Sequence, residues 1–164
     1  MDTQQEIVLG VTTISTPSDR EIVNERVFNA PRERVFAAYI DPDLLARWWG
    51  PRGTTTTVEQ LDPRPGGVWR FVVRDDADGR LNAFKGVFRE VSPPERIAQT
   101  FEWEGLPGHV VLEAATFEDL GEGRTRVRGT SLFHTSEERD GMLASGMEKG
   151  LGESHDRLAD LLAD

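Results

Sequence analysis

His109 and Glu113 are the pair of residues in this sequence best suited to proton transfer. If both lie on one strand, their even spacing points them to the same face as the apolar Val111 and Phe117. On such a face an imidazole and a carboxyl group would have shifted pKa values and could act as general acid and base. Four strand residues span roughly 13 Å, however, which is too far for direct contact. The alternatives are a surface His109, and a Glu113 at a pocket rim or paired with an arginine such as Arg26.

Aromatic residues at every second position form a second pattern with chemical meaning. Side chains two apart on a strand share one face, so these rings would gather on one side of a sheet. The strand sets are Trp69, Phe71 and Val73, then Phe101 and Trp103, and finally Val127, Gly129, Ser131 and Phe133. Together they predict an aromatic wall that faces a helix and either packs as a solid core or borders a cavity.

Four glycines interrupt the apolar stripe of the last expected helix. They are Gly141, Gly146, Gly150 and Gly152, and each costs roughly 1 kcal/mol relative to alanine inside a helix. Gly146 and Gly150 would lie one turn apart on the covered face. They either leave room for a ligand or allow the helix to approach the sheet closely.

Other apparent catalytic or metal-binding patterns fail on geometry. Ser154, His155 and Asp156 are consecutive, but neighbours on a helix point about 100° apart and cannot form a nucleophile relay. The acidic run 75–79 imitates a calcium loop, yet its register places Arg74 and Lys85 where carboxylates are required. We therefore assign no catalytic residue, no metal site and no cofactor.

The charge balance argues against nucleic acids and membrane surfaces as partners. The 164 residues carry a formal net charge of −10, a sign that repels phosphate and anionic lipid. Arg124, Arg126 and Arg128 are expected on an outward strand face with acidic neighbours such as Glu118. The chain has no cysteine, no apolar run long enough to span a membrane and no secretion signal, so we expect a cytoplasmic protein.

The length favours a single domain. Turn residues and helix-start residues predict where its helices and strands lie. Residues 1–19 form either a tail or an extra edge strand, with a small apolar patch at Ile7, Val8, Leu9 and Val11. A strand over 21–29 leads to two short helices, the first with Pro31 at its first position and the second starting at Asp41-Pro42.

Between Thr54 and His134, turn residues recur so often that about six strands must pair as an antiparallel meander. The capping box Thr135–Glu138 then opens a helix that runs to the C-terminus. The expected architecture is α+β: a curved antiparallel sheet of six to seven strands around one long helix, with two short helices closing an end. A single helix cannot fill such a concavity, so a cavity is expected between helix and sheet.

Eight short motifs match one known family in order and spacing. They are Arg26–Pro31, Val35-Phe36, Asp41-Pro42, Trp48–Pro51, Arg64–Trp69, Gly86–Val91, Pro94–Arg96 and Gly146–Gly150. Over about residues 20–164 the chain resembles the START-like (SRPBCC, Bet v-type) proteins of the heat-shock-protein-ninety ATPase activator homologue branch. The resemblance implies the helix-grip fold. That fold serves binding of lipids and polyketides, cyclase chemistry and chaperone activation, so it leaves function open.

We expect non-covalent binding of a small hydrophobic or aromatic molecule between the last helix and the sheet. The alternatives are a cyclase or dehydrase using the same pocket, and a protein-interaction module like the chaperone activators. The oligomeric state is left open, with a homodimer as one arrangement. The candidate ligand-binding residues are Trp48, Trp49, Trp69, Phe71, Phe101, Trp103, Phe117, Phe133, Met147, Gly150 and Leu151, with His109 and Glu113 as polar pocket residues.

Overall fold

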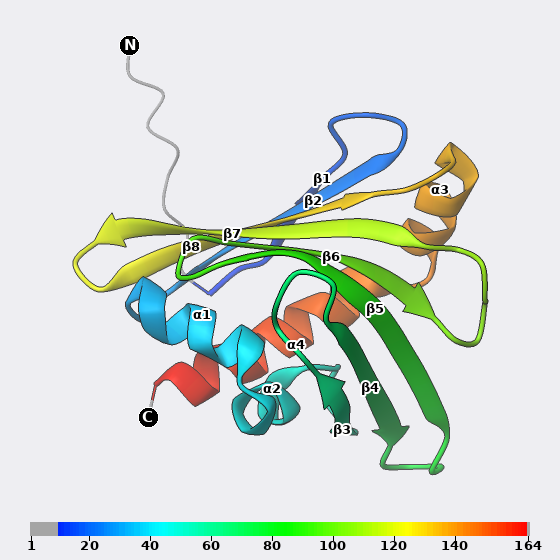
Figure 1. Ribbon diagram of the computed structural model, residues 1–164, viewed down its shortest axis with the longest axis horizontal. Coiled ribbons are helices and arrows are strands. Elements are labelled where there is room, and N and C mark those ends of the chain that lie inside the picture. The colour runs from blue at the N-terminus through cyan, green and yellow to red at the C-terminus, as the bar shows by residue number, and fades with distance from the viewer. Residues whose placement is uncertain (1–9, 164) are drawn as a thin grey trace.

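A curved sheet of eight antiparallel strands dominates the computed structural model, which describes residues 10–163 (Figure 1). The strands lie in the order β1-β2-β8-β7-β6-β5-β4-β3. Their bounds are β1 Thr13–Ser15, β2 Glu21–Phe28, β3 Thr54–Leu61, β4 Val68–Asp75, β5 Leu81–Ser92, β6 Arg96–Trp103, β7 Val111–Gly121 and β8 Arg124–Leu132. From β3 to β8 each strand pairs with the next, which confirms the predicted meander.

The strand count exceeds the expected six to seven because of β1. This short strand pairs with β2 at the sheet edge, inside the stretch expected to be a tail or an extra edge strand. Of the apolar patch near the start of the chain, Ile7, Val8 and Leu9 lie outside the described residues, while Val11 is exposed. The α+β helix-grip architecture itself is confirmed.

Two short helices follow β2, α1 over Arg32–Ile40 and α2 over Pro42–Trp48. Pro31 is the N-cap of α1 and not its first helical residue. Asp41 ends α1 and caps α2, since its Oδ1 accepts hydrogen bonds from the amides of Asp43 at 2.9 Å and Leu44 at 3.3 Å.

The closing helix is broken into α3, Ser136–Ala144, and α4, Met147–Leu162, which corrects the expectation of one continuous helix. Thr135 caps α3 as predicted, accepting a hydrogen bond from the Glu138 amide at 3.1 Å. The break lies at Gly146, whose φ of 86° is left-handed. A residue without a Cβ atom adopts that conformation at little cost, so the chain turns there and restarts as α4.

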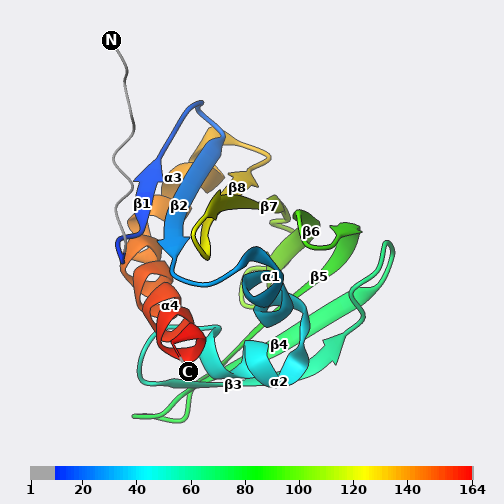
Figure 2. The ribbon, with the colours of Figure 1, turned by 90° about the vertical axis from the view of Figure 1, so that its left-hand side faces the viewer.

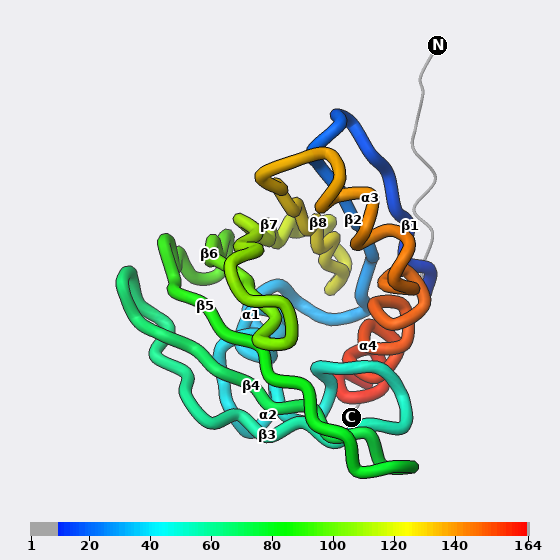
Figure 3. Tube along the Cα trace, turned by 90° about the vertical axis from the view of Figure 1, so that its right-hand side faces the viewer, coloured from blue at the N-terminus to red at the C-terminus, as the bar shows by residue number. Residues whose placement is uncertain are grey.

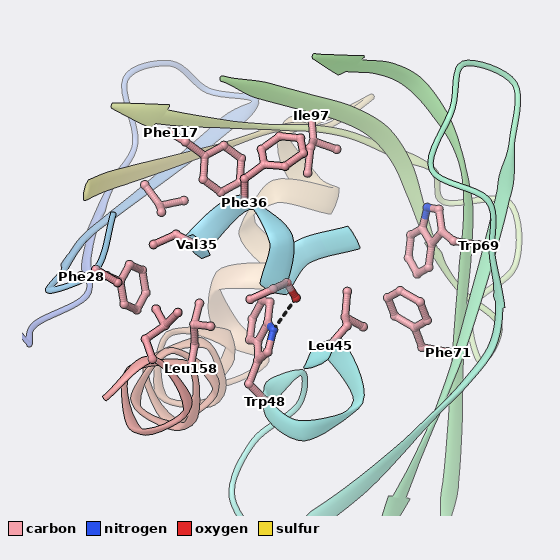
Figure 4. Close-up of a cluster of buried hydrophobic side chains, with 14 of the residues drawn as sticks. Phe28, Val35, Phe36, Leu45, Trp48, Trp69, Phe71, Ile97, Phe117 and Leu158 are labelled. Carbon is pink, nitrogen blue, oxygen red and sulfur yellow. Dashed lines mark hydrogen bonds between the residues drawn. The ribbon is translucent and has the colours of Figure 1, made fainter. Parts of the chain in front are cut away.

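The sheet wraps around α1, and α4 crosses the open side next to β1 and β2 (Figure 2). Seen from the opposite end, the strands form an arc with α3 and α4 along its other side (Figure 3). The largest buried cluster joins α1 and α2 to the C-terminal half of α4 through Leu158 and Leu162 (Figure 4). A smaller cluster centred on Ile22, Val111 and Phe133 receives α3 and Met147. Helix α4 is therefore held near both of its ends by separate apolar clusters.

Candidate functional site

A cavity of about 530 Å³ lies between α4 and the concave face of the sheet. Its walls come from β2 to β8, α1, α2, the loop after α2, and the two closing helices. Apolar side chains predominate. The apolar and aromatic residues that line it include Ile22, Tyr39, Leu45, Trp48, Trp49, Phe71, Val73, Phe84, Phe88, Ile97, Phe101, Val127, Phe133, Met142, Met147 and Leu151.

One wall of the cavity is a connected set of aromatic rings. The Trp49 ring lies edge-on to Phe71 and Phe84, with centroids 5.1 Å and 5.2 Å apart. Phe84 in turn stacks on Phe101 at 5.5 Å. Such mutual contacts fix the rings in place, so this wall is a preorganised apolar surface.

The opposite wall is the first half of α4, which approaches the sheet without filling the space. A Cβ atom added at Gly150 would meet no heavy atom within 4 Å outside its own helix backbone. The helix is instead secured further along, where Ser154 Oγ donates to the Trp48 carbonyl at 2.9 Å and accepts from the Gly50 amide at 3.2 Å. At Gly150 the helix therefore does not approach the sheet closely, and the glycine faces open space.

A row of polar side chains crosses the inner face of three neighbouring strands. Gln99 of β6 stands opposite Glu113 of β7, which stands opposite Ser131 of β8. The Ser131 hydroxyl donates to Glu113 Oε2 at 3.4 Å. On β2, the Asn24 side chain lies over Gly129, so close that a Cβ atom there would be 2.6 Å from the Asn24 amide nitrogen. The sheet side of the cavity is thus amphipathic.

Glu113 is the group of this row with the most altered acidity. By surface area it is only partly buried, because its side chain faces the cavity, yet protein atoms surround it closely. Desolvation raises the pKa of the Glu113 carboxyl to about 7, and the Ser131 hydroxyl lowers it only in part. At neutral pH this carboxyl group can therefore either hold or release a proton.

His155 on α4 also borders the cavity, where it is buried. Its Nδ1 lies 2.8 Å from the Thr12 hydroxyl, and its ring is edge-on to Phe28 at 5.7 Å. Burial and the neighbouring Arg26 guanidinium lower the pKa of His155 to about 4, so the imidazole is neutral at pH 7. Arg26 itself donates to Asp156 Oδ1 at 2.6 Å, an ion pair between β2 and α4.

Comparison with known proteins places this arrangement in a family. The sequence pattern described as Activator of Hsp90 ATPase homolog 1-like protein matches residues 29–163. The chain belongs to this family. No curated protein matches the chain.

Solved structures of bacterial proteins share the fold over nearly the whole chain. A protein from Rhodobacter sphaeroides is 27% identical with a TM-score of 0.86, and the match covers 93% of this chain and 99% of that one. A protein from Chromobacterium violaceum is 29% identical with a TM-score of 0.77, covering 88% and 98%. An AHSA1 protein from Silicibacter pomeroyi is 25% identical with a TM-score of 0.72, covering 87% and 97%.

Within this AHSA1 fold, eight of the eleven expected ligand-binding residues line the cavity. They are Trp48, Trp49, Phe71, Phe101, Phe133, Met147, Gly150 and Leu151, and Glu113 joins them as a polar residue. Trp48 is also a structural residue, since its Nε1 donates to the Ala38 carbonyl at 2.8 Å (Figure 4).

Two expected lining residues, Trp69 and Phe117, belong to the buried core and do not line the cavity. Trp69 is 1% exposed, stands against Phe71 at 4.7 Å and donates from Nε1 to the Thr100 carbonyl at 3.2 Å. Phe117 is enclosed by Phe36 and Tyr39, with both ring centroids 5.0 Å away. Their strand parity was correct, but each packs against a ring that lines the cavity and does not line it itself.

Trp103 lies outside the cavity although it shares parity with Phe101. It is the last residue of β6 and 41% exposed, and its Nε1 donates to the Asn82 side chain at 3.1 Å. Its ring lies so close to Gly105 that a Cβ atom there would clash at 2.3 Å. At this strand end the ring packs on its own turn, so the expectation for Trp103 is corrected.

His109 is not a pocket residue either. It precedes β7 and is exposed, and its Nδ1 donates to Glu138 Oε1 at 2.6 Å. This hydrogen bond holds the pKa of the Glu138 carboxyl below its usual range. Of the alternatives for this pair, a surface His109 is the one observed, because β7 begins at Val111 and does not include His109.

Several residues that line the cavity were not predicted from the sequence. Phe84 and Phe88 share strand parity with Gly86 between them, which is the same signal that identified Phe71. Gln99 and Asn24 were missed because a polar residue on an inward face is not expected without a partner. The parity of Gln99 with Phe101 was the available signal.

The motifs rejected on geometry have structural roles. Ser154, His155 and Asp156 bind three different partners, namely Trp48, Thr12 and Arg26. In the 75–79 turn, Asp75 accepts a hydrogen bond from the Ala77 amide, and Asp78 accepts one from the Arg80 amide that follows the turn. Among residues 10–163, no group of three or more His, Cys, Asp or Glu could hold a metal ion, and no helix is long and apolar enough to cross a membrane.

Proposed function

We propose that this AHSA1-family chain binds a small hydrophobic or aromatic molecule, without covalent chemistry, in the cavity between α4 and the sheet. The observation that carries the proposal is a preorganised aromatic wall that faces open space at Gly150. Volumes of about 300–1,000 Å³ are usual for small-molecule sites, and the 530 Å³ here lies within that range.

The way α4 is anchored supports a functional cavity over a packing defect. Leu158 and Leu162 enter one buried cluster and Met147 packs on the other. Between these anchors the helix presents Gly150 to the cavity, where a larger apolar residue would increase both burial and helix propensity. The glycine at position 150 provides neither the extra burial nor the helix propensity, which is consistent with space kept for a ligand.

The first experiment is native mass spectrometry of the protein purified from its own host. We expect a retained small molecule that dissociates on denaturation. Binding of a fluorescent apolar probe then compares Gly150→Leu, which fills the cavity, with Gly152→Leu. Gly152 is a matched control because it lies on the same helix, also faces open space, but does not line the cavity. Equal probe binding by both folded variants would contradict the proposal.

A second candidate function, an acid–base enzyme of the cyclase or dehydrase type, is favoured by one observation. The Glu113 carboxyl faces the cavity and has a pKa of about 7, close to an ideal value for a proton-transfer group at neutral pH. The test incubates the retained molecule with the protein. A change of its mass or structure that Glu113→Gln abolishes would support catalysis, and an unchanged molecule would support binding alone.

A further inference from the structure

The ionisable groups that line the cavity are unbalanced in charge. Among the described residues, the lining contains two carboxyl groups, Asp75 at the end of β4 and Glu113 in β7, and no lysine or arginine. The remaining titratable side chains are Tyr39 on α1 and His155 on α4. Burial raises the pKa of Tyr39 and lowers that of His155, so both are neutral at pH 7.

The basic group on the inner face of β2, Arg26, is already engaged. It is 5% exposed, pairs with Asp156 of α4 and lies over the Phe28 ring at 5.4 Å. Glu113, by contrast, is flanked in the sheet by the uncharged Gln99 and Ser131. Desolvation and the Ser131 hydrogen bond account for its acidity, with no contribution from a charged neighbour. Glu113 is therefore a partly buried, desolvated carboxyl group without a basic partner, and it lines the space a ligand would occupy.

We propose that the cavity selects a molecule with an aromatic or alicyclic body and one positively charged nitrogen, which forms an ion pair with Glu113. This inference rests on the function proposed above and names the chemical class of its ligand. The nitrogen would supply the missing partner of the carboxylate, and the ring body would lie against Trp49, Phe84 and Phe101.

The placement of Glu113 beside the aromatic wall fits such a molecule. Phe101 pairs with Val111, and Glu113 pairs with Gln99, so Phe101 is the diagonal neighbour of Glu113 on the same face. A cation held at the carboxylate is therefore within reach of an aromatic face, and a ring attracts a nearby cation through its quadrupole.

Two other ligand classes agree less well with the lining. A carboxylate such as a fatty acid anion would enter a site without a cation to receive it, next to two acidic groups. A neutral apolar molecule would bind the rings but leave Glu113 desolvated and unpaired. The overall charge of −10 further favours the approach of a cation over that of an anion.

The test uses three probes that share a naphthalene body: 2-(2-naphthyl)ethylamine, the neutral 2-(2-naphthyl)ethanol, and 2-naphthylacetate. Dissociation constants are measured by calorimetry for the wild type at pH 8. We expect the amine to bind at least about tenfold more tightly than the alcohol, and the acetate to bind weakest. In Glu113→Gln, which keeps the side-chain shape, the amine should lose that advantage while the alcohol binds at least as well as before.

The pH dependence gives a second readout for the same ion pair. Because the amine stays protonated and requires an ionised Glu113, its affinity should fall by up to about 30-fold from pH 8 to pH 5.5. Affinity for the alcohol should not fall over this range. Asp75→Asn is the matched control, since it removes the other lining carboxylate and should leave both the amine preference and its pH dependence unchanged.

The outcomes separate the two proposals. If the alcohol binds as tightly as the amine and Glu113→Gln changes nothing, the cation proposal is overturned while ligand binding stands. Tightest binding of the acetate, or loss of the amine preference in Asp75→Asn, would also overturn it. Binding of none of the three probes at millimolar concentration would overturn both the ion pair and the proposed function.

Discussion

At Gly150, helix stability and cavity volume oppose each other directly. We expect Gly150→Ala to stabilise the unliganded protein, because the added methyl group meets open space and the helix gains up to about 1 kcal/mol of propensity. For a domain of this size that gain corresponds to a rise of about 2–4 °C in melting temperature. Thermal unfolding followed by circular dichroism measures it, and a bulky apolar ligand should bind less tightly.

Gly86→Ala is the contrasting variant for that measurement. Gly86 lies in β5, where a Cβ atom would be 1.9 Å from the Thr100 carbonyl oxygen and 2.5 Å from the Trp69 indole nitrogen. Overpacking of this kind typically costs about 1–3 kcal/mol, so its melting temperature should fall. A lower midpoint for Gly150→Ala as well would show that α4 touches the sheet and that Gly150 does not face free space.

Two desolvated titratable residues, Glu113 and His155, should impose opposite pH dependences on stability. The pKa of Glu113 is raised to about 7, so its contribution is complete below its ordinary pKa near 4.5 and is lost as pH rises through 7. The pKa of His155 is lowered to about 4, so its contribution is complete above 6.5 and is lost as pH falls through 4. Between pH 4.5 and 6.5 the two effects oppose each other.

Single variants expose each effect in urea unfolding at several pH values. Relative to the wild type, Glu113→Gln should gain stability as pH rises from 4.5 to 7, with a slope of at most about 1.4 kcal/mol per pH unit. His155→Gln should instead gain as pH falls from 6.5 to 4. A parallel offset of either variant at every pH would mean that its residue does not titrate in this window.

Turn and helix-capping residues in the sequence predicted most of the helices and strands. Turn residues between Thr54 and His134 placed six strands, and Asp41-Pro42 placed the start of α2. The closing helix was the exception. Its apolar stripe continues through Gly146, and a single glycine inside a helical pattern does not distinguish a tolerated residue from a left-handed break. The break accompanies tertiary packing that no local pattern encodes: α3 and Met147 pack on the smaller cluster, while the end of α4 packs on the larger one.

The break can be tested with two glycines of the same segment. Gly146→Ala should destabilise the protein by about 1–2 kcal/mol, because its φ of 86° is unfavourable for a residue with a Cβ atom. Gly141→Ala in α3 should stabilise it, since its backbone has no such φ and its Cβ atom meets open space. Equal gains from both substitutions, measured by thermal unfolding, would indicate that the closing helix is continuous.

For the tertiary structure, strand parity predicted which rings face inward along one wall of the site. It could not predict which of those rings line the cavity and which lie in the buried core. It placed Phe71 and Phe101 on the inner face, where they line the cavity. It also placed Trp69 and Phe117 there, yet these rings belong to the buried core and do not line the cavity. Parity fails at Trp103, where the strand ends and the ring turns back on Gly105. The polar row from Gln99 to Ser131 depends on register across three strands, which no local pattern encodes.

We expect an apolar ligand to raise the melting temperature of the protein, and a chelator or a nucleotide to leave it unchanged. An apolar aromatic ligand that binds only the folded state stabilises it by mass action, by about 2.7 kcal/mol at 100 times its dissociation constant. For 164 residues this corresponds to a rise of about 5–11 °C in melting temperature. A chelator or magnesium-ATP should leave the midpoint unchanged, because we found neither a phosphate-binding motif in the sequence nor a metal-binding cluster among the described residues. Differential scanning calorimetry of the wild type and Gly150→Leu completes the design. The apolar ligand should shift only the wild type, since the variant has lost the space that Gly150 leaves open.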